Sequence, residues 1–126
     1  MAAAVFDLVN EYAVDQGSQF AVDFSLKING VARNIGTPIA YSVRGQIREN
    51  FETATIIATF VCSVTDAANG KFRISLTPAV TKLLVPGKYL YDIEIFQSGN
   101  DDVICERVIK GKVEITRFKG LGEMMP

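Results

Sequence analysis

Carboxylates occur in pairs at two places in the sequence, and paired carboxylates are groups that hold metal ions or transfer protons. Asp101 and Asp102 are adjacent, whereas Asp92 and Glu94 share one face of an alternating segment, about 7 Å apart by strand rise. The first pair falls in a turn, where Asp side chains bind their own backbone, and the second fills a solvent-exposed face. We therefore expect no metal or acid–base site at these residues. The same holds for Glu49 and Glu52.

Histidine is absent from the sequence, and only two cysteines, Cys62 and Cys105, are present. Without histidine, Ser-His-Asp and Cys-His catalytic groups and His-containing metal sites cannot form. The cysteines are too few for a four-thiolate zinc site and too distant in sequence for a Cys-x-x-Cys motif. Both share the parity of apolar neighbours, so we expect buried and unreactive thiols. Because the glycines also form no phosphate-binding motif, we expect a protein that is not an enzyme and has no catalytic, cofactor-binding or metal-binding residues.

Basic residues gather near the end of the sequence, and such stretches can bind nucleic acid. They are Arg107, Lys110, Lys112, Arg117 and Lys119. Two glutamates interrupt the run, aromatic residues are not interleaved with it, and 13 basic residues are balanced by 14 acidic ones in the whole chain. We therefore expect solvated strand faces and no nucleic-acid partner. Arg107 is an exception, because it lies in an otherwise inward-facing set, which alternation does not explain.

The elements that position these residues are mainly strands, because apolar and polar residues alternate along most of the sequence. The segment 20–28 alternates without error and leads into Asn29-Gly30, a dipeptide typical of a type I′ hairpin turn, which predicts a return strand over 31–35. Other alternating segments predict further strands. They cover 39–47, 56–64, 71–77, 88–96 and 103–116, the last with a bulge at Gly111.

One segment departs from the strand period. Thr77 suits a helix N-cap, Pro78 suits the first helical position, and Val80, Leu83 and Leu84 recur at helical spacing. We expect one short helical turn here. Short strands separated by turn residues, without long helices, predict an all-β fold, an antiparallel β-sandwich of about seven to eight strands.

The beginning of the chain predicts where the protein is made. The segment MAAAVFDLVNEY lacks the basic region of a secretory signal, and Asp7 interrupts its apolar stretch. No run approaches the roughly 18 apolar residues that a membrane-spanning helix needs. We expect synthesis in the cytoplasm, no membrane association, and loosely held first residues.

The segment PGKYLY (86–91) resembles the Gly-x-Tyr-x-Cys region of immunoglobulin-like domains. In that family the tyrosine hydrogen-bonds to the preceding backbone at the corner between two strands, and the resemblance implies this role for Tyr89. Tyr91 stands where an antibody domain has its second cysteine, and Trp is absent from the sequence. The resemblance therefore implies an immunoglobulin-like sandwich without the disulfide between its sheets.

Taken in order, the strand segments resemble small immunoglobulin-like domains of tailed-bacteriophage virion proteins. The segments are QGSQFAVDFSLK, YSVRGQIREN, DAANGKFRISLTPAVTKLL, PGKYLYDIEIF and VIKGKVEI, within roughly residues 5–116. The resemblance implies one domain over 1–116 that serves as a structural module of the tail, baseplate, fibre or capsid exterior. It also implies location in the virion after synthesis in the host cytoplasm, with other virion proteins as partners and self-association or many copies per particle. Contacts would spread over a surface, so no partner-binding residue is singled out.

The last ten residues, RFKGLGEMMP (117–126), resemble the KGLGEM segment of the toprim region in gyrase B and topoisomerase IV ParE subunits. The acidic metal-binding segments of that family are missing here, so no catalytic role is assigned to 119–123. We expect a flexible C-terminal extension over 117–126. An alternative function is a topoisomerase-binding mimic or inhibitor that uses this tail. A third is a carbohydrate-binding adhesin module, although most Phe and Tyr residues have core-facing parity.

Overall fold

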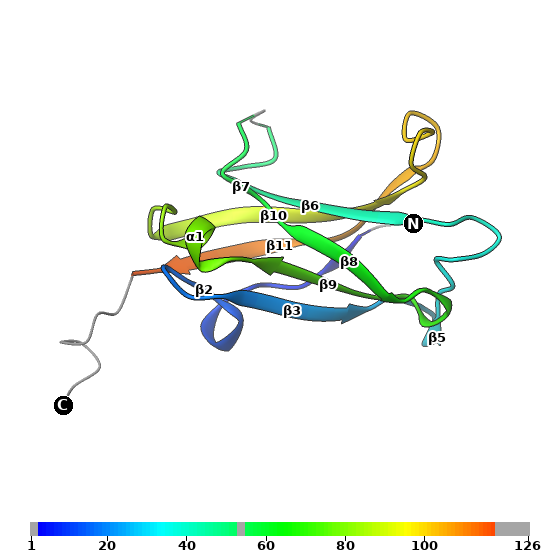
Figure 1. The fold of residues 1–126 in the computed structure, drawn as a ribbon, viewed down its shortest axis with the longest axis horizontal. Coiled ribbons are helices and arrows are strands. Elements are labelled where there is room, and N and C mark those ends of the chain that lie inside the picture. The colour runs from blue at the N-terminus through cyan, green and yellow to red at the C-terminus, as the bar shows by residue number, and fades with distance from the viewer. Residues whose placement is uncertain (1–2, 53–54, 118–126) are drawn as a thin grey trace.

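The computed structural model describes residues 3–52 and 55–117, and within them the fold is all-β (Figure 1). The strands are β1 (Ala4–Val5), β2 (Val14–Asp15), β3 (Phe20–Ser25), β4 (Lys27–Ile28), β5 (Val31–Ala32), β6 (Ser42–Arg48), β7 (Ala58–Thr59), β8 (Val61–Asp66), β9 (Lys71–Leu76), β10 (Gly87–Phe96) and β11 (Cys105–Thr116). The helical elements are η1 (Asn10–Tyr12), η2 (Ala67–Asn69) and α1 (Pro78–Thr81). Six of these strands have six or more residues and the other five have two, where the sequence predicts about seven to eight strands.

Two sheets form the two layers of the fold. Sheet A has the order β1-β11-β10-β6-β7, and β2 also pairs with β11. Within it β10 is antiparallel to both β6 and β11, whereas β1 and β2 run parallel to β11. Sheet B is antiparallel with the order β3-β9-β8, and β4 and β5 form a separate hairpin. This hairpin turns at Asn29-Gly30, where both residues have positive φ, as the sequence predicts.

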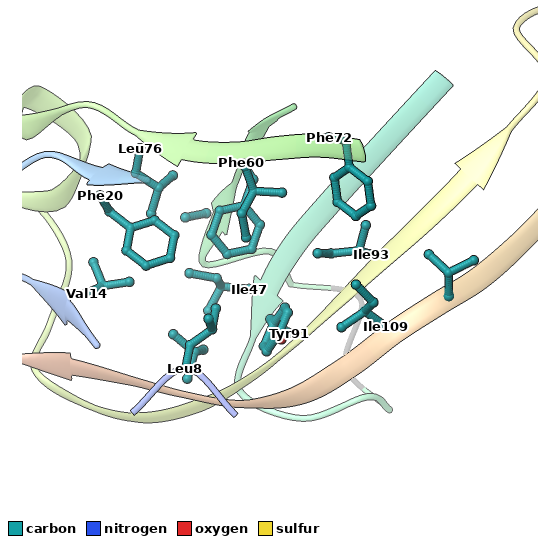
Figure 2. Close-up of a cluster of buried hydrophobic side chains, with 14 of the residues drawn as sticks. Leu8, Val14, Phe20, Ile47, Phe60, Phe72, Leu76, Tyr91, Ile93 and Ile109 are labelled. Atoms are coloured by element: carbon teal, nitrogen blue, oxygen red, sulfur yellow. The ribbon is translucent and has the colours of Figure 1, made fainter. Parts of the chain in front are cut away.

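The core lies between the two sheets (Figure 2). Phe72 and Leu76 of β9 point inward from Sheet B, and Tyr91 and Ile93 of β10 point inward from Sheet A. These four side chains and Ile74 of β9 are 0–1% exposed. The predicted inward parity of both strands is therefore confirmed, and the strong burial shows why alternation was such a clear signal.

The single strand predicted over 56–64 is in fact two strands, because the chain changes sheets within it. The residues form β7, which pairs with β6 in Sheet A, and then β8, which pairs with β9 in Sheet B. Phe60 lies at the crossing and is 4% exposed, with its ring close to Phe20 of β3 and Tyr91 of β10. A strand that changes sheets keeps its inward parity, because both sheets face the same core.

The short helical turn is confirmed as α1, but its predicted buried residues are partly wrong. Leu84 is buried, whereas Leu83 is 77% exposed and Val80 is 39% exposed. The buried position on this turn is instead Thr81, whose Oγ1 donates to the Ser18 carbonyl at 2.8 Å. This hydroxyl is satisfied by a segment far away in sequence, which local spacing does not reveal.

The predicted bulge at Gly111 is also wrong. The irregularity in β11 lies at Val108, where Ile93 pairs with Ile109 but Glu94 pairs with Arg107. The extra residue lets Val108 and Ile109 both be buried and reverses the parity before them. Gly111 is needed for a different reason, because a Cβ atom there would lie 2.1 Å from the Phe6 carbonyl oxygen. The return strand over 31–35 and the strand over 39–47 are shorter than expected, namely β5 and β6.

Candidate interaction surface

The outer side of Sheet A carries a dense set of charged side chains, which we call the charged face. It consists of the residues of β6, β10 and β11 that alternate with the buried ones. Its cations are Arg44, Arg48, Lys88, Arg107, Lys110 and Lys112, and its carboxylates are Asp92, Glu94 and Glu114. Six of the 13 Lys and Arg residues of the chain therefore lie on one face of one sheet. Cross-strand pairing in Sheet A brings these groups together, because residues opposite each other share a face.

Arg44 is the best-anchored residue of the charged face. Its Nε donates to Glu94 Oε1 at 2.9 Å, and its Nη1 donates to Asp101 Oδ2 at 3.2 Å. The guanidinium carbon also lies 4.4 Å from the centre of the Phe96 ring, in cation–π geometry. The hydrogen bond to Glu94 raises the pKa of Arg44 above its already high ordinary value. This arginine is therefore a fixed, permanently charged part of the surface.

Arg107 belongs to the same face, which resolves its unexplained place in the sequence pattern. The bulge at Val108 reverses the parity of β11, so Arg107 points outward. Its Nη2 lies 3.1 Å from Asp92 Oδ2, and its guanidinium carbon lies 5.0 Å from the centre of the Phe51 ring. Alternation along β11 therefore places Arg107 on the opposite side of the sheet from the one that the sequence pattern predicts.

The carboxylate pairs of the sequence are separated by these arginines. Asp92 and Glu94 share the outer face of β10 as predicted, but each has its own arginine on a different neighbouring strand. Asp101 and Asp102 are exposed in the turn before β11, and Asp101 binds Arg44. Glu49 and Glu52 are exposed beyond β6. Among residues 3–52 and 55–117, no group of three or more His, Cys, Asp or Glu side chains is arranged to hold a metal ion.

The two cysteines differ more than the sequence predicts. Cys62 of β8 is half-buried, its Sγ lies 3.7 Å from the Phe60 carbonyl, and burial raises its pKa to about 11. Cys105 is exposed, so the expectation that it is buried is wrong. The bulge at Val108 is again the reason, because it places Cys105 and Arg107 together on the outside. The Cys105 thiol accepts a hydrogen bond from Arg44 Nη2 at 3.4 Å.

Two tyrosines of β10 tie segments to the body of the fold. Tyr89 Oη donates to the Val85 carbonyl at 2.8 Å, which is the backbone contact that the resemblance implies for this residue. Tyr91 is 0% exposed and its Oη donates to the Phe6 carbonyl, and burial raises its pKa above the ordinary value. Tyr91 thus holds the N-terminal segment against Sheet A from inside the core.

Grooves of about 390–540 Å³ open on the surface of the described residues, among them one of about 540 Å³ beside Gln16 and the start of α1. One of about 410 Å³ lies between β1 and the end of β3 and includes Phe6, Phe24 and Leu26. The ion pair of Arg33 Nη1 and Glu106 Oε2, 2.6 Å long, stands in its wall. Another groove of about 390 Å³ lies along the charged face.

The structure describes most of the basic stretch but only the first residue of the tail. Lys110 and Lys112 lie on the charged face, and Arg117 is exposed. Lys119 and the rest of the tail, 118–126, lie outside the described residues. The tail hypothesis therefore keeps its basis in the sequence alone.

No protein-family model matches this chain, and no curated protein matches its sequence. Among the described residues, none of the helices has the length and apolar character to cross a membrane.

Proposed function

We propose that this chain is an immunoglobulin-like β-sandwich and a non-enzymatic structural module of a tailed-bacteriophage virion, acting through protein–protein contacts. Its site in this proposal is a surface, in contact with other virion proteins. The tail, baseplate, fibre and capsid exterior are the places in a particle where such a module would serve.

The observation that carries the proposal is the arrangement of six strands together with Tyr89. Strands β11, β10 and β6 lie side by side in one layer, and β3, β9 and β8 lie side by side in the other. This order supports an immunoglobulin-like sandwich, because β3-β9-β8 and β6-β10-β11 match the strand orders B-E-D and C-F-G of its two sheets. The hydrogen bond from Tyr89 to Val85 supports it further, because it lies at the corner leading into β10.

The charged face supports a role in contacts between proteins. Its best-placed arginines are held by carboxylates and aromatic rings, so the surface presents charges in fixed positions. Fixed and interspersed charges favour selection of a complementary protein surface. Because Asp92, Glu94 and Glu114 stand among the cations, the face is a poor match for the uniform charge of a nucleic-acid backbone.

Mass spectrometry of purified phage particles tests the proposal. The protein should be found in mature particles at a constant copy number, and electron microscopy should show density lost from particles made without its gene. Its absence from mature particles would overturn the proposal. Capture of a gyrase subunit by the full chain, lost when residues 117–126 are deleted, would favour the topoisomerase alternative instead.

A further inference from the structure

The outer strand edges of the two sheets differ in how much of their backbone is paired. In Sheet A, much of the outer edge of β11 is covered by β1, β2 and a bridge from Leu8 to Val113, and the opposite edge ends in the two-residue strand β7. In Sheet B, no strand of the described residues pairs with the outer edges of β3 and β8. An uncovered strand edge offers unpaired backbone N–H and C=O groups to another chain.

Strand β8 has the less protected of these two edges. Its six residues, VCSVTD, contain no Pro, Gly or Lys, and the single charge stands at its end, in Asp66. Val61 is 61% exposed and Val64 is 38% exposed. By contrast, β3 carries Asp23 within the strand, and the Phe6 ring packs against Phe24 beside it. Charges within an edge strand are a usual protection against pairing, and β8 has none before Asp66.

We propose that β8 pairs antiparallel with β8 of a second copy of this chain, so that two Sheets B join into one continuous sheet around a two-fold axis. This inference rests on the proposed function, which requires copies of the protein to contact one another or their neighbours. A two-fold contact uses the same patch on both copies, and an antiparallel strand pair is self-complementary in this way.

The strand pattern limits where the axis can lie. Residues directly opposite in an antiparallel pair point to the same face, so the axis must pass beside a residue and not between two residues. The register of β8 with β9 is regular from Val61 to Val64 and shifts before Asp66. A pair centred on the regular part has its axis at Cys62 or Ser63. In both cases the two copies of Ser63 are opposite or diagonal neighbours, roughly 5–8 Å apart.

Charge and exposure are compatible with this contact. The outward-facing residues of the regular part are Val61 and Ser63, which are uncharged and exposed, so no like charges meet at the axis. Arg73 of β9 lies directly opposite Ser63, on the side of β8 away from the joined edge, and its charge is already paired with Asp23 of β3 at 2.8 Å. Pairing therefore buries exposed Val61 and satisfies backbone groups without placing an ion pair in the contact.

Sedimentation of the full chain over a concentration series tests the proposal. The unaltered protein should form dimers, and Ser63→Lys and Ser63→Glu, each alone, should raise the dissociation constant at least about tenfold, because like charges then meet at the axis. An equal mixture of the two variants should restore dimers. The matched control is Ala21→Lys, an exposed position on β3 of the same sheet, which should dimerise like the unaltered protein.

A second measurement locates the contact. Amide hydrogen exchange should slow in β8 as the concentration rises, and β3 should not change. Circular dichroism establishes that each variant is folded, and Val61→Lys serves in place of the Ser63 variants if these unfold.

A chain that stays monomeric at all concentrations, or a dimer unaffected by the edge variants, would overturn the inference. A monomeric chain that is nevertheless found in particles would leave the proposed function standing. A β8 dimer absent from particles would defeat the proposed function and leave this inference intact.

Discussion

Sheets A and B supply the same core but meet the outside in different ways. Sheet A covers the edge of its last strand with the N-terminal segment and carries the charged face, where arginines and carboxylates hold one another. Sheet B has one outer ion pair, between Asp23 and Arg73, and leaves the edge of β8 uncovered. Both sheets therefore contribute to the buried core, whereas Sheet B has the longer uncovered strand edges.

The largest expected effects test the shared core. Ile93→Ala in Sheet A and Ile74→Ala in Sheet B both remove a side chain that is 0% exposed, and each should lower the free energy of unfolding by about 2–5 kcal/mol. Urea denaturation measures both. Leu83→Ala, at a position 77% exposed, is the control and should stay within about 0.5 kcal/mol of the unaltered protein. A small effect of only one isoleucine variant would mean that the sheets do not share one core.

The covered edge of Sheet A is tested by Gly111→Ala. The added Cβ would lie 2.1 Å from the Phe6 carbonyl oxygen, so the N-terminal segment must move away from β11. We expect a loss of about 1–3 kcal/mol in the free energy of unfolding and faster amide exchange in β1. Lys112→Ala, at the adjacent outward position, should change stability by less than about 0.5 kcal/mol. Equal stability of the two variants would show that this edge tolerates displacement.

Two substitutions in β10 should have smaller effects on the free energy of unfolding, and they test how segments are attached to Sheet A. Tyr91→Phe leaves the Phe6 carbonyl without its buried donor and should lower the free energy of unfolding by about 1–3 kcal/mol. Tyr89→Phe removes a more accessible bond to Val85 and should cost about 0.5–1.5 kcal/mol. Thermal and urea denaturation give the order of the two. The reverse order would mean that the corner before β10, and not the N-terminal segment, is the more important attachment of Sheet A.

The smallest effect concerns the ion pair between Arg33 and Glu106. The Arg33 hydrogen bond lowers the pKa of Glu106 below its ordinary 4.5, so the folded state binds this proton less readily than the unfolded state. The resulting stability is present above the unfolded pKa and is lost as pH falls through the folded value. Glu106→Gln should therefore flatten the acid side of the stability profile, measured by urea denaturation below pH 5. Arg33→Gln should flatten it equally, and the double variant should add nothing further. An unchanged acid slope in both single variants would contradict this assignment.

The alternation of apolar and polar residues predicted the inward side chains well, because every second side chain of a strand points to the core in either sheet. The same fact explains the error over 56–64. Ala58 and Phe60 keep the inward parity while the chain passes from one sheet to the other, so the pattern reports the core and not the sheet. The bulge was predicted at Gly111 and lies at Val108 for a related reason. Its position becomes clear only from the register of β11 with the neighbouring strand β10.

The surface was predicted less completely than the core. Parity identified Asp92 and Glu94 as outward-facing, but their arginines come from strands whose neighbours are set by the fold. Arg44 and Glu94 are far apart in sequence and become opposite each other only through the register of β6 and β10. Cys105 was misjudged because its exposure depends on the same bulge. A contact surface assembled across strands in this way has no signal in any single segment.

The parallel course of β1 and β2 beside β11 has a mechanical consequence. Tension applied to the chain through its first and last strands pulls these neighbours in opposite directions along their length. Their hydrogen bonds are then loaded in shear and must break together, whereas an antiparallel pair pulled from one end opens bond by bond. The resistance of this protein to stretching should therefore reside in the contact between its first and last strands, and it is governed by the rate of forced opening there.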